Sequence, residues 1–286
     1  MATAGQGGAP AQLEMPGMPR RLFPATPSKL ACFSDCPRRY RFTYVDRPTP
    51  PKGPPWAHNT VGSAVHAALH SWWELPVERR TPVAARQLMY QAWSDNGFRD
   101  AEQSQRWRAR AATWLTDYVA GLDPTDEPVG VERQVAATTE RLALTGRVDR
   151  IDRRGDELVI VDYKTGRSVC TEDEARGSPA LAAYVLGARR TLRRPCSRVE
   201  LHHLPSGTVA GFEHTEKSLA NHVRRAEDVA ADIGAATAAL DDGASPDEAF
   251  PAVPGRQCGW CDFRPSCPVG QAATPPREAW SFLAEE

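Results

Sequence analysis

Asp149, Asp162 and Lys164 are the residues whose types and spacing most clearly suggest chemistry. They stand in the segment LTGRVDRIDRRGDELVIVDYKTGR, residues 144–167, whose apolar residues otherwise indicate two strands of a sheet. Two carboxylates in contact repel each other, and a divalent cation between them removes that cost. Mg²⁺ prefers carboxylate, water and phosphate oxygens, and a nearby lysine can orient or deprotonate a metal-bound water. The set predicts metal-assisted hydrolysis of a phosphodiester.

The turn between the two strands fixes how these residues face one another. A two-residue loop at Gly155–Asp156 suits a type II′ turn, because glycine is at its first central position. With that turn Asp149 lies opposite Asp162, with Cβ atoms roughly 4.5–5.5 Å apart, and Lys164 lies on the face of Asp162. The alternative is a charge ladder on the surface. The apolar run at 158–161 argues against a solvent-exposed strand.

The elements that must position these residues follow from periodicity. Apolar positions at helical spacing predict helices on both sides of the hairpin, whereas alternating apolar residues predict strands in the middle of the chain. A short helix is also expected after Ser28, which suits an N-cap. The predicted helices cover 61–73, 83–96, 102–122, 178–192 and 216–241, and the predicted strands cover 129–138, 141–152, 157–165 and a second hairpin at 197–214.

Length and charge set further bounds. A chain of 286 residues with 41% hydrophobic content can form one large domain or two small ones. The formal net charge of −1 gives no overall basic field for nucleic acid. Basic clusters at 20–47 and 186–198 are more typical of solvated surface than of a nucleic-acid site when taken alone.

The opening segment predicts neither export nor membrane insertion. Residues 1–25 are rich in Ala, Gly, Gln and Pro and lack an apolar signal core, so we expect a disordered tail. The chain has no apolar run long enough to span a membrane, and a cytoplasmic protein is expected. In a cytoplasmic protein its seven cysteines are expected to be thiols or metal ligands rather than disulfides.

Four segments in order resemble a known family. They are PSKLACFSDCPRRYRFTY, GSAVHAAL, GRVDRID with LVIVDYKTG, and QCGWCDFRPSC. Together they resemble the PD-(D/E)xK superfamily of nucleases, in the form of RecB-type exonuclease domains and the related CRISPR-adaptation nucleases. The resemblance covers about residues 26–270 and includes a C-terminal cysteine cluster.

The resemblance implies an α/β fold with a restriction-endonuclease-like core. A central mixed sheet would be flanked by helices, with a helical insertion and a cysteine-rich C-terminal tail. The nuclease domain would run over 26–270, followed by a terminal tail at 271–286. Its parts would be a helical part at 56–122, a catalytic sheet core at 129–215, a helix at 216–243 and a cysteine cluster at 251–270.

The family pattern also assigns roles to individual residues. It implies Asp149 and Asp162 as ligands of a catalytic Mg²⁺ or Mn²⁺, Lys164 as the catalytic lysine and His66 as an extra metal ligand. His70 lies one turn from His66. Without the resemblance such a pair is more typical of a helix surface or a satisfied core histidine. The spacing from the family's glycine favours His66.

One position departs from the family pattern. The family usually carries a Gln four residues before a Tyr on the helix after the lysine strand. Here Tyr184 is present, but the matching position is Ala180. Activity could therefore be weaker or differently tuned. We expect Tyr184 to contact DNA, together with three arginines of the CPRRYRF segment, Arg38, Arg39 and Arg41.

Three cysteines near the end have C-x2-C-x5-C spacing, Cys258, Cys261 and Cys267. Three thiolates need a fourth partner to close a metal site. The resemblance implies Cys36 as that partner and a [4Fe–4S] cluster as the ligand, with structural Zn²⁺ as the alternative. Cys32 is the alternative fourth ligand. The two remaining cysteines, Cys170 and Cys196, show no pattern and are expected to be ordinary thiols.

The function expected from the sequence is that of a metal-dependent DNA nuclease, similar to RecB exonucleases and acting in DNA repair or recombination. One alternative is a non-cleaving DNA-binding or scaffold module that keeps the fold and the cluster, although the intact Asp149, Asp162 and Lys164 set argues against it. Hydrolysis of a small phosphodiester is disfavoured by the arginine clusters. The chain has no G-x-x-x-x-G-K-[ST] motif, so it would act alone or be recruited by a separate helicase.

Overall fold

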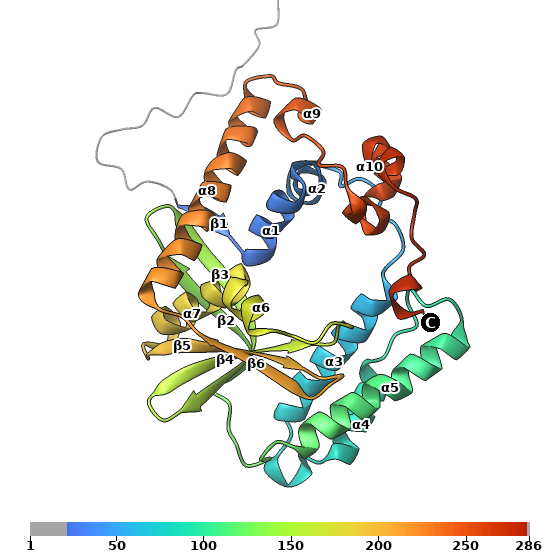
Figure 1. Cartoon of the computed structure of the whole chain (residues 1–286), viewed down its shortest axis with the longest axis vertical. Coiled ribbons are helices and arrows are strands. Elements are labelled where there is room, and N and C mark those ends of the chain that lie inside the picture. Colours follow the sequence, from blue (N-terminus) through green and yellow to red (C-terminus); the bar gives the residue numbers. More distant parts are fainter. Residues whose placement is uncertain (1–21, 285–286) are drawn as a thin grey trace, which may run out of the picture.

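The structure is a computed structural model that describes residues 22–284. Its centre is a mixed sheet of six strands with helices on both faces (Figure 1). This confirms the predicted α/β fold class. Within the described range no helix has the combination of length and apolar character that crossing a bilayer requires.

The strand β3 organises the sheet. The order is β1-β3-β4-β5-β6, and β2 also pairs with β3. β3 is antiparallel to β2 and β4 and parallel to β1, whereas β4 and β5 are parallel, and β5 and β6 form a hairpin. The strands are β1 Phe23–Ala25, β2 Gly130–Thr138, β3 Leu142–Arg154, β4 Glu157–Lys164, β5 Cys196–His203 and β6 Thr208–Glu213.

One edge of β3 is paired at its two ends and open between them. β2 pairs with residues 143–151 of β3 on one side. On the other side β1 pairs with residues 142–144, and β4 pairs with residues 150–154. Residues 145–149 therefore have no strand partner on that side. The gap leaves backbone and side chains of β3 accessible in the middle of an otherwise covered sheet.

The helices form two layers. α7 packs on β2, β3 and β5 on one face, whereas α3, α4 and α5 form a separate helical group on the other (Figure 1). The long helix α8 runs beside α1 and α7. The helices are α1 Pro27–Asp35, α2 Pro37–Tyr40, α3 Ala57–Trp73, α4 Pro82–Ala92, α5 Ala101–Ala120, α6 Glu172–Gly177, α7 Pro179–Leu192, α8 Glu216–Asp241, α9 Pro246–Ala249 and α10 Pro268–Ala273.

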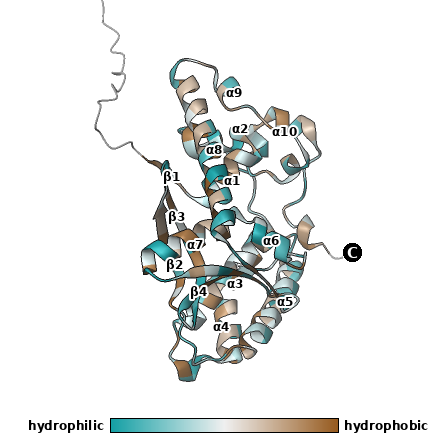
Figure 2. Ribbon diagram, turned by 60° about the vertical axis from the view of Figure 1, so that its left-hand side comes forward, coloured by the Kyte–Doolittle hydropathy of each residue, from teal (hydrophilic) through white to brown (hydrophobic). Residues whose placement is uncertain are grey.

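Three apolar clusters hold these layers together. One joins α3, α4 and α5 to Val159, Val161 and Tyr163 of β4. A second joins α7 to the sheet, and a third joins α1, β1 and α8. Figure 2 shows hydrophobic residues on α7 and around β1 and β3, and both hydrophilic and hydrophobic turns along α8. That alternation fits the single apolar stripe predicted for 216–241.

The hairpin of β3 and β4 has the predicted turn, and its register follows the prediction as far as the pair Arg150–Val161. The predicted pairing of Asp149 with Asp162 is not formed, because the strands separate beyond Arg150 and Val161. Gly155 has φ +63°, as the first central position of a type II′ turn requires. Arg154 pairs with Glu157, and Arg150 pairs with Val161. The hairpin thereby carries Asp149 and Asp162 to the start of the gap in β3.

The two ends of the described chain are more structured than the sequence indicates. Residues 1–21 of the predicted disordered tail lie outside the described residues, but Phe23–Ala25 form β1. Near the other end, Leu283 is buried against the helical group, and its carbonyl accepts a hydrogen bond from the Trp107 indole at 3.0 Å. Residues 271–284 are therefore docked on the domain.

Candidate active site

A cleft of about 1150 Å³ opens at the gap in β3. Its walls come from α1, α3, β2, β3 and the start of α7. His66, Glu132, Arg147 and Asp149 lie on its lining with Tyr184. Segments that are far apart in the sequence thus present polar side chains to one hollow.

Asp149 is the first β3 residue beyond the paired hairpin. The ladder to β4 ends at Arg150 and Val161, where the two strands separate. The Tyr163 backbone N–H then donates a hydrogen bond to Asp149 Oδ2 at 2.8 Å. The side chain of Asp149 therefore bridges the fork between the strands.

Asp162 and Lys164 form an ion pair beside this fork. The distance from Lys164 Nζ to Asp162 Oδ2 is 2.6 Å. Burial lowers the pKa of Lys164, but the attraction of Asp162 outweighs it and raises the pKa above its usual value. Burial raises the pKa of Asp162, and the nearby charge of Asp149 adds to the rise, although Lys164 opposes it. The Asp149 and Asp162 side chains are each 15% exposed, whereas that of Lys164 is 46% exposed, so the ammonium lies at the solvent side of two largely buried carboxylates.

His66 reaches the same place from α3. Its Nδ1 lies 3.5 Å from Asp149 Oδ1, and its Nε2 lies 3.2 Å from the Tyr163 carbonyl oxygen. Burial lowers the pKa of His66, but Asp149 outweighs burial and raises it. His70 also lines the cleft, yet it pairs with Glu74 at 3.5 Å. The structure thus brings His66 rather than His70 to Asp149.

Glu132 is a site residue that the sequence analysis missed. Donor atoms of His66, Glu132 and Asp149 all lie within 4.8 Å of one another, and within the described chain these three form the one such group of three or more potential metal ligands. Glu132 has φ +48°, a left-handed backbone that is uncommon for a side chain of this kind. Its Oε2 accepts from Arg147 Nε at 2.8 Å. A strained residue at a ligand cluster points to a functional constraint.

The strained backbone explains how Glu132 reaches the cluster. Val135 packs against α7, whereas Val131 packs against the helical group on the other face. Residues an even number of positions apart on a regular strand share one face, so β2 reverses its facing between them. β3 does the same, because Val148 lies on the α7 side and Arg150 contacts Trp73 of α3. The two reversals flank Glu132 and Asp149.

The sequence carried only a weak signal for this reversal. In the predicted strand 129–138, Val129, Val131 and Val135 fit one buried face, but Arg133 interrupts it. Glu132 then falls on the polar face, where an acidic residue needs no explanation.

The donor set suits a hard divalent cation. Two of the three donors are carboxylates, which favour Mg²⁺ or Mn²⁺, and the third is an imidazole nitrogen. The Asp149 and Glu132 side chains are only 15% and 19% exposed, so their repulsion is weakly screened. A bound cation would offset that repulsion, and the residues therefore fit the metal that the sequence analysis expected.

Tyr184 forms one wall of the cleft. A Cβ added at Gly146 would lie 2.5 Å from Tyr184 Cε1, so the ring covers the β3 backbone where no side chain intervenes. Burial raises the pKa of Tyr184 to about 12, and the phenol stays neutral. Ala180, at the position where the family usually has Gln, also lines the cleft and offers no polar group there.

The three arginines of the CPRRYRF segment differ in their surroundings. The Arg38 and Arg41 side chains are each 9% exposed, and both pair with Asp247 at 2.9 Å. Their guanidinium groups tie α2 and the following turn to α9. Arg39 is 40% exposed and meets Asp35 at 3.5 Å. Of the three, Arg39 alone is well placed to contact a ligand from solvent.

The three cysteines singled out by spacing and the one implied by the family resemblance surround one cavity. A cavity of about 550 Å³ has Cys36, Cys258, Cys261 and Cys267 in its lining. Cys32 does not line it and lies 4.0 Å from Thr43 Oγ1. The structure thus brings Cys36, rather than Cys32, to the three C-terminal cysteines.

The remaining two cysteines lie apart from that cavity. Cys170 and Cys196 are buried in the cluster between α7 and the sheet. Burial raises the pKa of both thiols, that of Cys196 to about 12. Neither is therefore activated as a thiolate.

Comparison with known families identifies the class of protein. The chain belongs to the PD-(D/E)XK nuclease superfamily, whose family description matches residues 24–268. Members of this class are metal-dependent nucleases, and the match covers β3, β4 and the cleft. A comparison with curated proteins gives no match.

Among solved structures, the chain is similar to one described as "Crystal structure of SSO0001". The two share 15% sequence identity, and the alignment covers 85% of this chain and 95% of that chain, with a TM-score of 0.32. A likeness at that level carries no argument about fold or function.

Proposed function

We propose that the chain is a metal-dependent deoxyribonuclease of the RecB exonuclease type that acts in DNA repair or recombination. The observation that carries the proposal is the meeting of His66, Glu132 and Asp149 beside the Asp162–Lys164 pair. Superfamily membership supplies the nuclease class. The cleft supplies space for a nucleic-acid strand at His66, Glu132 and Asp149, whereas Asp162 and Lys164 are not among its lining residues.

His66, Glu132 and Asp149 would hold Mg²⁺ or Mn²⁺, and Asp162 would add a carboxylate from β4. When bound, the ion would act as a Lewis acid on a phosphate oxygen and would lower the pKa of a bound water. Asp162 also pairs with the ammonium of Lys164 at 2.6 Å, so its carboxylate would contact both the ion and the lysine.

Lys164 would act on the attacking water and on the phosphate. Its raised pKa keeps the side chain as an ammonium. The ammonium would donate a hydrogen bond to the oxygen of the attacking water and offset negative charge at the phosphorus. The water oxygen would bond to phosphorus and lose a proton to solvent, and the bond from phosphorus to the sugar oxygen would break as that oxygen takes up a proton from solvent. Lys164 therefore orients the attacking water.

DNA would lie along the cleft between α1 and α7. Tyr184 offers an aromatic face beside the ligands, and base stacking on such a ring is worth about 1–3 kcal/mol. Arg39 would contact the phosphate backbone near the cysteine cavity. Because the chain has no nucleotide-binding motif of its own, processive degradation of duplex DNA would need a separate helicase.

The cysteine cavity would hold a [4Fe–4S] cluster. Four cysteines line the cavity and could supply the four thiolates of such a cluster, Cys36, Cys258, Cys261 and Cys267. A single Zn²⁺ is the alternative occupant, because it accepts the same four thiolates.

The cluster is tested by metal analysis of anaerobically purified protein. We expect about four iron atoms per chain and a broad absorption near 400 nm, as a cube held by four cysteines gives. Cys36→Ser should bleach this band, whereas Cys170→Ser should not. A colourless protein with one zinc per chain would replace the cluster by a zinc site, and an unchanged band in Cys36→Ser would assign the fourth ligand to Cys32.

The nuclease activity is tested with end-labelled single-stranded and double-stranded DNA. The anaerobically purified protein should cut at least one of these substrates with Mg²⁺ or Mn²⁺, and a chelator should stop the reaction. Label release as mononucleotides would support the exonuclease assignment, and internal fragments would contradict it. DNA binding with no cleavage under any metal would contradict the nuclease proposal and favour a non-cleaving module.

A further inference from the structure

Tyr163 contacts two proposed metal ligands through its main chain. Its N–H donates to Asp149 Oδ2 at 2.8 Å, and its carbonyl oxygen accepts from His66 Nε2 at 3.2 Å. A carbonyl can only accept, so the hydrogen of a neutral His66 ring resides on Nε2. That leaves the lone pair of Nδ1 directed toward Asp149, which is the arrangement a metal-binding histidine needs.

The β4 backbone at Tyr163 is supported by β5 on one side alone. Tyr163 pairs with His202 of β5, but β3 has already separated at Val161. A strand held on one side can rotate about its remaining ladder. Such a rotation would move the N–H and the carbonyl of Tyr163 together, and Asp149 and His66 would lose their orientation at once.

The side chain of Tyr163 restrains this rotation. The residue is 3% exposed, and its hydroxyl accepts hydrogen bonds from Arg150 Nη1 at 3.3 Å and from Trp73 Nε1 at 3.4 Å. Trp73 belongs to α3, the helix that carries His66. The phenol therefore ties β4 to the two elements, β3 and α3, from which Asp149 and His66 project.

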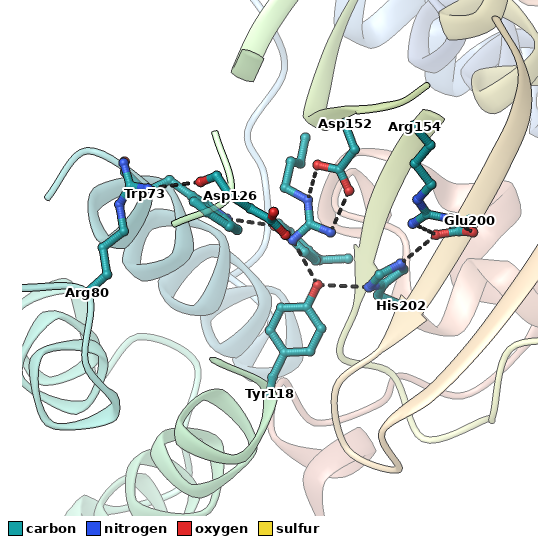
Figure 3. A network of polar contacts seen from close by, with 10 residues as sticks. Trp73, Arg80, Tyr118, Asp126, Asp152, Arg154, Glu200 and His202 are labelled. Carbon is teal, nitrogen blue, oxygen red and sulfur yellow. Dashed lines mark hydrogen bonds and ion pairs between the residues drawn. The ribbon is translucent and has the colours of Figure 1, made fainter. Parts of the chain in front are cut away.

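Arg150 is itself fixed by a buried polar network (Figure 3). Its guanidinium group pairs with Asp152 at 2.9 Å and donates to the Tyr118 hydroxyl at 3.2 Å, which also meets His202 Nδ1 at 2.8 Å. Arg150 is 4% exposed. Burying a guanidinium group is costly unless every donor finds a partner, so the network holds it in one position.

We propose that Tyr163 and Arg150 are positioning residues for the catalytic metal, acting through the main chain of Tyr163. The inference rests on the proposed metal-dependent function. Neither side chain reaches the ion. The phenol and guanidinium groups fix the peptide units on both sides of Tyr163, and these fix Asp149 and the ring of His66.

The test is Tyr163→Phe, which removes the hydroxyl and keeps the ring packing. Mutation of groups that orient metal ligands without touching the metal typically weakens metal affinity by 10–100-fold. The variant should bind Mn²⁺ about tenfold more weakly by calorimetry without DNA, and saturating Mn²⁺ should restore most of the cleavage rate. Tyr40→Phe is the matched control, because Tyr40 is equally buried at 3% but lies in another cluster. It should bind Mn²⁺ as wild type does.

The outcomes separate the two proposals. Wild-type protein that binds no Mn²⁺ would overturn the proposed function itself. Wild-type protein that binds Mn²⁺, with unchanged affinity in Tyr163→Phe, would overturn the positioning role alone, whatever the variant does to thermal stability. Tyr118→Phe, which removes the next link to Arg150, should give a smaller loss in the same direction, and a larger loss than that of Tyr163→Phe would contradict the proposed order.

Discussion

Glu132 combines a left-handed backbone with a carboxylate close to that of Asp149. A non-glycine residue in this conformation costs about 1–2 kcal/mol. The negative charge of Asp149 adds a repulsion that the exposed Arg147 relieves only in part, since its guanidinium group is 69% exposed. A bound cation would offset the repulsion, and the strain is a reason to assign Glu132 a function.

Glu132→Asn should therefore separate stability from metal binding. Asparagine tolerates the left-handed region and carries no charge, so the metal-free protein should be as stable as wild type or up to about 1 kcal/mol more stable. Mn²⁺ binding should weaken. Chemical denaturation and calorimetry measure the two effects. Glu132→Gln keeps the strain and loses the charge, and a stability equal to that of Glu132→Asn would show that the backbone contributes nothing.

The residues predicted from sequence differ from Glu132 in one physical respect. Asp149, Asp162 and Lys164 interrupt strands whose neighbours are apolar, so their types are conspicuous in the sequence. His66 was identified by a family motif on a helix. Glu132 becomes a candidate ligand only when the facing of β2 reverses, and the one local sign of that reversal is Arg133 on an otherwise apolar face.

Among the elements, α7 lies unusually close to the sheet. A Cβ added at Gly187 would lie 2.7 Å from Val135 Cγ2 and 3.3 Å from the backbone of Ala136, so the helix sits directly on β2. This approach places Tyr184, one turn earlier in α7, over β3 at the cleft. Glycine at this position permits the contact between helix and strand.

Gly187→Ala should cost about 1–3 kcal/mol of unfolding free energy, because the methyl group must push α7 away from β2. The matched control is Gly234→Ala in α8, where an added Cβ meets nothing within 4 Å. Alanine there should stabilise the protein by up to about 1 kcal/mol through helix propensity. Equal effects in thermal unfolding would show that α7 is not packed against β2 as described.

Periodicity predicted the long elements well and the short ones poorly. Helix α8 has the bounds expected from its apolar stripe, Glu216–Asp241. β1 was assigned to a tail, because three residues are too few for a pattern and their partner lies more than a hundred positions along the chain. The gap in β3 depends on β1, so the position of the cleft could not be derived from local sequence.

At the scale of the molecule, the C-terminal segment has more anchors than its cysteines. In the structure Phe250 is fully buried against α1 and α8, Phe263 lies 5.4 Å from Phe42, and Leu283 packs on the helical group. Loss of one cysteine should therefore disturb the cavity more than the attachment of the tail.

The stability of the whole domain should fall in mild acid because of His214. Burial lowers the pKa of His214 to about 4, against 6.5 for an ordinary histidine, and the nearby charges of His222 and Arg189 act in the same direction. Between these two values the unfolded chain binds a proton that the folded protein does not. Stability therefore decreases as the pH falls from 6.5 to 4, with a slope of up to about 1.4 kcal/mol per pH unit for this group.

Urea unfolding of wild-type protein and His214→Gln at several pH values measures this contribution. The difference in unfolding free energy should change across the window from 6.5 to 4 and stay constant above it. Glu200 provides an internal check, since its pKa is lowered by His202, Arg154 and Arg198 against the effect of burial. Its contribution is lost below the ordinary value of 4.5 in both proteins. Parallel curves throughout would show that folding leaves the pKa of His214 unchanged.

The most direct measurement is the single-turnover cleavage rate of Lys164→Ala on end-labelled DNA with saturating Mn²⁺. Removing the group proposed to orient the attacking water should lower the rate by at least about 10²-fold, while Mn²⁺ binding and thermal stability stay near wild type. Lys217→Ala, on the exposed start of α8, is the matched control and should cut at the wild-type rate. A Lys164→Ala variant that also cuts at the wild-type rate would contradict the assignment of this cleft as the active site.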